Sequence, residues 1–168
     1  MSREQLIKLL DLLPHPEGGF YKETYRSKGK LTQNCLGHEF QGVRNYSTCI
    51  YFMLTSGEFS AFHRIKQDEI WHFYEGSPVE LHMISKEGIH SKVKIGMDFE
   101  KGQRPQFVVP SGYWFASKVA DDGDFSLVGC TVSPGFDFID FEMAEAKDLI
   151  SRYPQHEKII RDFTRPAI

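Results

Sequence analysis

The sequence predicts a mainly β protein in which a short helix precedes an antiparallel barrel or sandwich and further helices follow it. Between residues 19 and 132, short segments rich in Phe, Tyr, Ile, Val and Thr are separated by Gly, Pro, Asp and Ser at the spacing of short strands. Both ends of the chain show helical periodicity instead. Strands are expected at 19–26, 47–55, 59–64, 69–74, 78–84, 91–95, 105–109, 113–118 and 126–132.

Helices are expected at the two ends of the chain. Ser2 and Gln5 have the spacing of a capping box, which predicts a helix within residues 1–14. A second helical region, 140–163, follows the strands and is expected to pack outside the barrel. Its helices are predicted at 143–152 and 155–163, separated by Pro154.

The whole chain, residues 1–168, is expected to form one domain, with the barrel at 19–132. No linker or internal repeat divides the sequence, and 168 residues are enough to bury one hydrophobic core. Residues 28–41 show no clear period, and we expect a mobile loop there.

Composition limits the possible partners and location. The net charge is −3 and the lysines and arginines are scattered, so neither nucleic acid nor a membrane surface is an expected partner. No apolar stretch approaches the roughly 18 residues that a membrane-spanning helix needs. Cys35, Cys49 and Cys130 are widely spaced and form no CxxC pair, which predicts neither disulfides nor a thiolate zinc site and favours a reducing, cytoplasmic location.

One segment carries the clearest motif. Residues 57–76 read GEFSAFHRIKQDEIWHFYEG and resemble the first cupin motif, G(X)5HXH(X)3–4E(X)6G, in which Gly57, His63, Glu69 and Gly76 are in register. The second cupin motif, G(X)5–7PXG(X)2H, is similar to the segment containing Gly102, Pro110 and Gly112. The resemblance implies a cupin double-stranded β-helix, a jelly-roll barrel whose interior binds a small molecule.

Two of the metal-ligand positions of the cupin motifs lack a histidine in this sequence. Ile65 stands where metal-binding cupins have a second histidine, and Phe115 stands where the second motif has one. A divalent metal normally takes three or four N, S or O donors, so His63 and Glu69 alone make a weak site. Strand alternation places His72 on the face opposite Glu69. No cofactor is therefore expected, and a metal, if bound, would use His63 and Glu69 with a third donor from His72, Gln67 or Gln106.

Two further resemblances cover other parts of the chain. Residues 15–27, HPEGGFYKETYRS, and 62–76, FHRIKQDEIWHFYEG, are similar to small bacterial and fungal cupins of the Cupin_5 type, which have no assigned activity. Residues 18–23 resemble a nucleotide-binding strand of the cupin epimerases that act on nucleotide-linked 4-keto-6-deoxysugars. The arginine of that strand is Gly18 here, which leaves Lys22 or Arg26 as substitutes.

The favoured hypothesis is a metal-independent isomerase or epimerase of a small carbonyl or sugar-like substrate. His63 would act as the base because an imidazole accepts protons near neutral pH, and Glu69 would orient it. Tyr51 or Tyr113 would return or stabilise the proton. Two alternatives stay open: a cupin that binds a small ligand without chemistry, and a metal-dependent enzyme with an incomplete ligand set.

The ligand-binding residues are predicted from alternation and from the epimerase resemblance. Trp71 and Phe115 are candidates for the wall of the pocket, with Tyr21, Glu23 and Gln106 as further contacts. The strand containing Tyr21 and Glu23 is exposed and able to exchange with a second copy, so we expect a homodimer.

The remaining polar residues are expected to be solvated. Arg64 and Lys66 flank His63 on the outer face, and no ligand spacing relates the other histidines. The expected surface histidines are His38, His82, His90 and His156, and the expected solvated acidic run is Asp137, Asp140 and Glu142.

Overall fold

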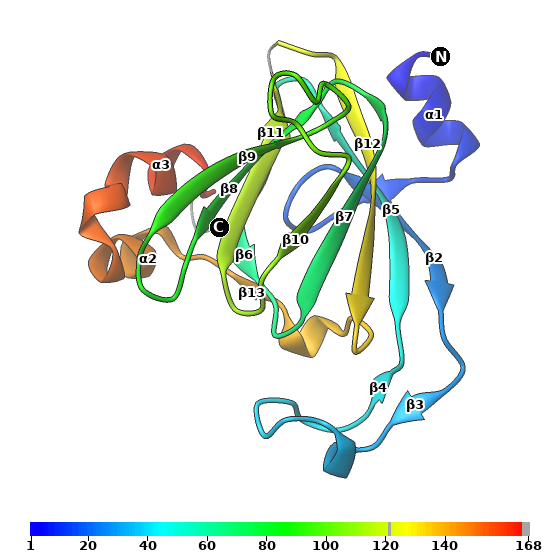
Figure 1. The fold of residues 1–168 in the computed structure, drawn as a ribbon, viewed down its shortest axis with the longest axis vertical. Helices are drawn as coiled ribbons and strands as arrows, with labels where there is room; N and C mark the ends of the chain where they lie inside the picture. The colour runs from blue at the N-terminus through cyan, green and yellow to red at the C-terminus, as the bar shows by residue number, and fades with distance from the viewer. Residues whose placement is uncertain (121, 166–168) are drawn as a thin grey trace.

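Two antiparallel sheets face each other in the computed structural model, which describes residues 1–120 and 122–165 (Figure 1). The six-stranded sheet has the order β1 (Leu13–Pro14), β2 (Phe20–Arg26), β5 (Thr48–Thr55), β12 (Phe125–Ser133), β7 (Asp68–Gly76) and β10 (Gln106–Val109). The five-stranded sheet has the order β13 (Glu142–Met143), β6 (Phe59–Arg64), β11 (Trp114–Val119), β8 (Val79–Ile84) and β9 (His90–Ile95). The fold is the jelly-roll barrel that the motifs implied.

Each of the nine predicted strands is present, with ends within two residues of the predicted ones. The sequence did not indicate β1, β13, or the pair β3 (Lys30–Leu31) and β4 (Arg44–Asn45). These strands are two residues long, and two residues cannot show alternation.

The core lies between the sheets because alternate residues of each strand point inward. On β7, Trp71 and Phe73 pack into the core, whereas His72 faces outward and lies 3.1 Å from the Thr131 hydroxyl. On β11, Phe115 points into the same core and Trp114 points out. The fully buried members of the core include Phe52, Trp71, Val79, Leu81, Ile95, Val109, Phe115 and Val128.

The helices cover the outer faces of the two sheets. Helix α1 (Arg3–Leu9) begins at the predicted capping box, in which the Gln5 N–H donates to the Ser2 hydroxyl at 3.3 Å. Helices α2 (Ala146–Arg152) and α3 (Glu157–Asp162), joined by the 3-10 turn η3 (Pro154–His156), pack on the five-stranded sheet. None of the helices in the described residues is long and apolar enough to cross a membrane.

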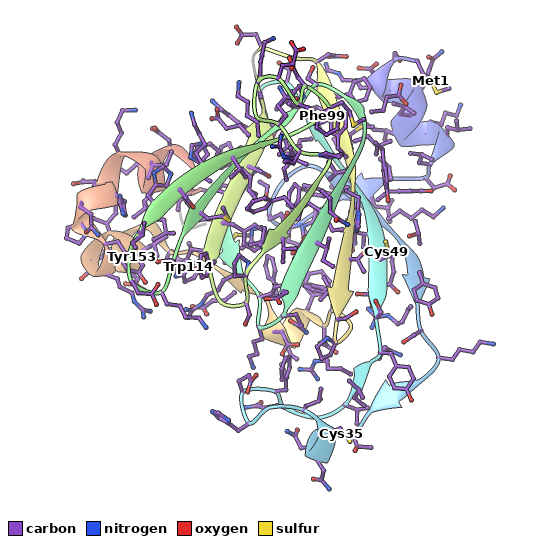
Figure 2. The ribbon with its side chains drawn as sticks, in the orientation of Figure 1. Met1, Cys35, Cys49, Phe99, Trp114 and Tyr153 are labelled. Atoms are coloured by element: carbon purple, nitrogen blue, oxygen red, sulfur yellow. The ribbon has the colours of Figure 1, made fainter. Side chains whose placement is uncertain are left out.

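Residues 28–45 form an arm that contains three short regular elements, in the region where a mobile loop was expected. The arm contains β3, β4 and the 3-10 turn η1 (Gln33–Cys35), and it projects from one end of the barrel (Figure 1). Its base is held by the buried Arg44, whose guanidinium bonds both oxygens of Asp140 at 2.6 and 2.7 Å. Figure 2 shows Cys35 on this arm, away from Cys49 on the sheet, and all three cysteines are free thiols.

Candidate functional site

A cavity of about 400 Å³ is enclosed by strands of both sheets and by the segment 136–141. Its buried lining comprises Glu17, Thr48, Phe52, His63, Ile65, Glu69, Cys130 and Val132. Its exposed lining residues, which mark the mouth, are Leu13, Glu23, Arg26, Asp137 and Phe138. The cavity therefore runs from an open mouth to a buried end that carries titratable groups.

His63 is held through both ring nitrogens. Its Nδ1 lies 2.8 Å from the Ala61 carbonyl oxygen, which only accepts, so Nδ1 carries a proton. Its Nε2 lies 2.9 Å from Glu17 Oε2. Burial by itself lowers the pKa of His63, but the charge and hydrogen bond of Glu17 outweigh burial and raise that pKa. Both ring nitrogens therefore face acceptors, and this geometry and the raised pKa favour the imidazolium form, which has no free lone pair.

Glu17 is the carboxylate of this ion pair. Burial alone would raise the pKa of Glu17, but the charge and hydrogen bond of His63 lower it. The Ser60 hydroxyl donates to Glu17 Oε1 at 2.9 Å and satisfies the second oxygen. The pair is thus buried, charged and fully hydrogen-bonded, as a buried ion pair must be to persist.

His15 lies on the other side of Glu17 and is neutral. Its Nδ1 accepts a hydrogen bond from the Glu17 N–H at 3.3 Å, so that nitrogen carries no proton. Burial lowers the pKa of His15 and outweighs the attraction of the Glu17 carboxylate, which lies 3.5 Å from Nδ1. The ring packs edge-on against Tyr21, with 4.5 Å between ring centroids.

Glu69 differs from these groups because its charge is not neutralised by a direct partner. Burial, and then repulsion from the Glu17 carboxylate, raise its pKa to about 7, although the charge of His63 opposes the rise. The Cys130 thiol lies beside it, and burial followed by the Glu69 charge raises the pKa of that thiol well above its usual value. Near neutral pH, Glu69 gains and loses a proton while Cys130 remains a thiol.

The local sequence explains how Glu17 reaches His63. Gly18 and Gly19 both have positive φ angles, 114° and 74°, and turn the chain into β2. A β-carbon at Gly18 would collide with the Phe59 carbonyl oxygen, so glycine is required there. The Ala61 N–H donates to the Glu17 carbonyl at 2.8 Å, which fastens this turn to β6 beside His63.

Comparison with known proteins identifies the family. The model of the Cupin_5 family, described as Cupin superfamily (DUF985), matches residues 4–144. The chain belongs to the cupin superfamily. The uncharacterized protein YML079W of Saccharomyces cerevisiae is 31% identical to this cupin over 166 residues, covering 94% of this chain and 82% of its own length.

Two solved structures are similar over nearly the whole chain. The protein SO0799 from Shewanella oneidensis is 42% identical, with a TM-score of 0.88 and 99% of each chain covered. A hypothetical protein from Leishmania major is 38% identical, with a TM-score of 0.89, and the match covers 98% of this cupin and 99% of that chain. The yeast relative is described as uncharacterized and the Leishmania protein as hypothetical, so the site must be interpreted from its own geometry.

The residues of the cavity do not fit a cupin metal centre. Ile65 lines the cavity where a second histidine ligand would lie, and Phe115 packs on His63 with 4.1 Å between ring centroids. Both nitrogens of His63 already have partners. Among residues 1–120 and 122–165, no group of three or more His, Cys, Asp or Glu side chains is arranged to hold a metal ion.

The predicted ligand contacts divide into two sets. Tyr21 and Glu23 line the cavity. Trp71 and Phe115 are buried between the sheets and do not line the cavity. Phe115 instead packs against the His63 ring.

Three predicted site residues lie elsewhere. Tyr51 is on the outer face of β5, where it packs on the cluster beneath α1, because the alternation that turns Phe52 inward turns Tyr51 outward. Tyr113 packs against the core outside the cavity lining. Gln106 is exposed on β10, and its side chain lies 3.5 Å from His72 Nδ1 on the outer face.

Sequence reasoning missed the partner of His63 and two groups beside it. Glu17, rather than Glu69, is bonded to the imidazole, and His15 and Cys130 complete the surroundings. Glu17 and His15 occur in the HPEGG segment used for the family resemblance, but nothing in the sequence pattern links that segment to β6.

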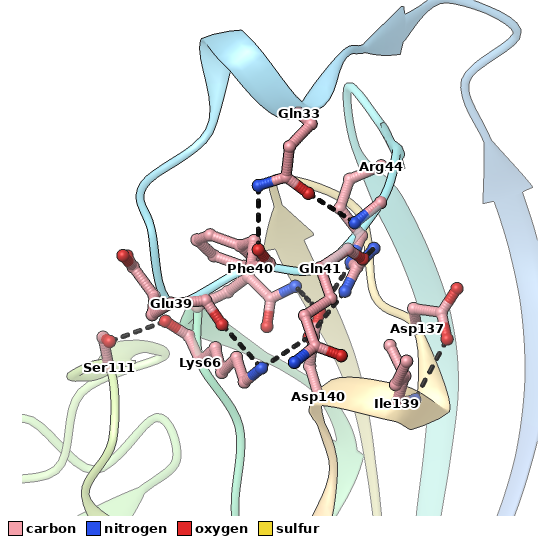
Figure 3. Close-up of polar contacts among 12 residues, drawn as sticks. Gln33, Glu39, Phe40, Gln41, Arg44, Lys66, Ser111, Asp137, Ile139 and Asp140 are labelled. Carbon is pink, nitrogen blue, oxygen red and sulfur yellow. Dashed lines mark hydrogen bonds and ion pairs between the residues drawn. The ribbon is translucent and has the colours of Figure 1, made fainter.

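Two residues that were expected to be solvated, Asp140 and His82, are buried in polar clusters. Asp140 is buried and accepts hydrogen bonds from Arg44 and from Gln67, and Lys66 lies 3.6 Å away (Figure 3). His82 is buried on the outer face of β8, where its Nδ1 lies 3.1 Å from His90 Nε2 and its Nε2 lies 2.9 Å from Glu80. The partners of Asp140 come from distant parts of the chain, whereas those of His82 lie on its own strand and on the adjacent strand β9.

Proposed function

We propose that this cupin is a metal-independent isomerase or epimerase of a small carbonyl compound, with Glu69 as the group that moves the proton. The observation that supports this proposal is the pKa of about 7 of a buried carboxyl group in an open cavity. A base is most effective when its pKa lies near the working pH, and perturbed carboxyl groups in clefts mark candidate catalytic sites.

In this reaction the Glu69 carboxylate removes the proton next to the substrate carbonyl and becomes a carboxylic acid. The electron pair of the C–H bond forms a C=C bond, the π pair of the carbonyl moves to its oxygen, and an enolate results. The fixed positive charge of His63 stabilises the enolate through space, since a preorganised charge in a dry site needs no reorganisation. In an α-hydroxy carbonyl substrate this enolate is an enediolate. Return of the proton to the former carbonyl carbon, with transfer of the hydroxyl proton to the other oxygen, completes the isomerisation and restores the carboxylate.

This mechanism changes the roles assigned from the sequence. His63 has no free lone pair, so the role of base passes from His63 to Glu69. Inversion at a single carbon needs a second proton donor, and Tyr21 is the phenol that lines the cavity. Tyr21 therefore takes the role first given to Tyr51 or Tyr113.

Hydrogen–deuterium exchange tests the proposal. A panel of enolisable ketones, aldehydes and sugars is incubated with the protein in D₂O, and loss of the α-proton signal is followed by NMR. We expect exchange of at least one compound, and Glu69→Gln should slow it by a factor of about 10² or more. Glu75→Gln, a change to an exposed residue of the same strand, serves as the matched control.

An absence of exchange with every carbonyl compound would reject the enzyme. Ligand-induced stabilisation without exchange would favour the alternative of a non-catalytic binding cupin, because a ligand that binds only the folded state raises the melting temperature.

We also propose a homodimer through the edge of β2. Strand β1 pairs only with Phe20 and Tyr21, so the outer edge of β2 from Lys22 to Arg26 has no strand partner among the described residues. An unpaired edge is a ready template for a strand from a second copy. Sedimentation that shows only monomers at high micromolar concentration would reject the dimer.

A further inference from the structure

The cations of the cavity lining are already paired with carboxylates. The three direct ion pairs are Lys22 Nζ with Asp11 at 2.9 Å, Arg26 with both oxygens of Glu23 at 2.9 and 2.8 Å, and His63 with Glu17 at 2.9 Å. Lys22 and Arg26 are the two residues expected to replace the nucleotide-binding arginine of the epimerases. Because both are occupied, a phosphate or carboxylate ligand finds no unpaired cation among the described lining residues.

Two carboxyl groups of the lining lack such a cation. Glu69 lies at the buried end and Asp137 lies at the mouth, and neither makes a direct ion pair among the described residues. Asp137 Oδ1 accepts a hydrogen bond from the Ile139 N–H at 3.0 Å, which fixes the carboxylate at the start of the 3-10 turn η2 (Phe138–Asp140) (Figure 3). The charges of Arg26 and Arg44 act on Asp137 without a direct ion pair. The described lining therefore holds four carboxyl groups, Glu17, Glu23, Glu69 and Asp137, against three cations, Lys22, Arg26 and His63.

Three phenylalanines of the segment that carries Asp137 line the cavity. Phe136, Phe138 and Phe141 lie edge to face, with centroids 4.9 Å apart for Phe136 and Phe138 and 5.8 Å apart for Phe138 and Phe141. The faces of aromatic rings carry negative potential and attract ammonium groups. A carboxylate among such rings favours a cation over a neutral group of the same shape.

We propose that the ligand of this cavity carries an ammonium group, which lies against the rings of Phe136, Phe138 and Phe141 and beside the Asp137 carboxylate. The other end of the ligand extends inward to Glu69, and this part of the inference rests on the proposed function. The inference names the substrate class as a small organic cation and disfavours nucleotide-linked sugars, whose phosphates would have to displace carboxylates from Lys22 and Arg26.

Choline and 3,3-dimethyl-1-butanol test the inference because they have the same shape and differ in charge. Each is titrated into the full-length protein at pH 7.5 and low salt, with binding measured by calorimetry and NMR. We expect choline to bind about tenfold more tightly than the uncharged alcohol.

The variant Asp137→Asn keeps an oxygen that accepts the Ile139 N–H and removes only the charge. It should weaken choline binding about threefold to tenfold and leave binding of the alcohol unchanged. Asp148→Asn, at the first turn of α2 and outside the cavity lining, makes the same change in net charge and should have no effect.

Equal affinity for choline and the alcohol, no binding of choline at millimolar concentration, or equal effects of the two variants would overturn the inference. None of these results bears on the exchange reaction, which is measured with uncharged carbonyl compounds. Conversely, failure of the exchange reaction with choline selectivity intact would reject the catalytic role of Glu69 and leave the cation site in place.

Discussion

The protein buries charge at the base of the arm and at the end of the cavity, and the two places differ in how completely the charges are paired. At the base of the arm, Asp140 bonds Arg44 at 2.6 and 2.7 Å and Gln67 at 2.9 Å. In the cavity, His63 and Glu17 pair at 2.9 Å, but Glu69 remains without a direct cationic partner.

This difference distinguishes a cluster that stabilises the fold from one that has a group able to exchange a proton. Arg44 and Asp140 hold each other in their charged forms, because their hydrogen bonds and mutual charge outweigh burial and lower the pKa of Asp140. For Glu69, burial and the repulsion from Glu17 outweigh the charge of His63 and the hydrogen bonds from Cys130 and Trp71, so its two protonation states lie close in free energy near neutral pH. Buried charge alone does not mark a functional site; an incompletely paired titratable group in an open cavity does.

The largest effect is expected at the base of the arm. Arg44→Met leaves Asp140 buried without its cation, and the free energy of unfolding should fall by about 3–5 kcal/mol. Urea denaturation at pH 7 measures the loss. The matched control is Arg64→Met, which breaks the more exposed pair of Arg64 with Glu142 and should cost no more than about 1 kcal/mol. Similar losses in the two variants would contradict the structural role of the Arg44–Asp140 pair.

Glu69→Gln should change stability in the opposite direction and in a pH-dependent way. The pKa of Glu69 is about 7 in the folded chain and near its usual 4.5 in the unfolded chain, so the unfolded state loses this proton first as pH rises. As pH rises from 4.5 to 7, ionisation of this carboxyl therefore favours the unfolded state and lowers the free energy of unfolding. Above pH 7 the loss is complete and is on the order of 3 kcal/mol. The variant should match the wild type near pH 4.5 and exceed its stability at pH 8.

Denaturation curves at several pH values measure this difference, with Glu75→Gln as the control on the same strand. Stability differences that stay constant between pH 4.5 and pH 8 would show that Glu69 titrates normally. The site would then lose the feature on which the proposed function depends.

The smallest effect is expected at the histidine pair on the outer face of the barrel. Burial lowers the pKa of both His82 and His90. The Glu80 carboxylate opposes the lowering of the His82 pKa. Repulsion from His82, His156 and Lys92 lowers the His90 pKa further. Because both pKa values lie below 6.5 in the folded chain, the unfolded chain binds protons first as pH falls. The free energy of unfolding therefore decreases below about pH 6.5. His90→Gln should reduce the decrease in melting temperature between pH 7.5 and pH 5.5, and an unchanged decrease would refute this.

Much of the fold followed from local patterns. Alternation of apolar residues located all nine longer strands, and it placed His72 opposite Glu69, because side chains of a strand point to two faces in turn. The capping box at Ser2 and Gln5 located the first helix. The two cupin motifs identified the family, since they preserve the glycines and the proline that the turns of the barrel require.

The sequence determined the architecture and the alternation of side chains along each strand, because these depend on neighbours along the chain, although Tyr51 and Gln106 were wrongly placed at the pocket. Only the tertiary structure decided which charges meet. Glu17 pairs with His63, and Arg44 with Asp140, through contacts between segments far apart in sequence, and burial of a charge is tolerated only where such a partner arrives. The same packing left Glu69 without a direct cationic partner, and the resulting rise in its pKa could not be deduced from any spacing of residues.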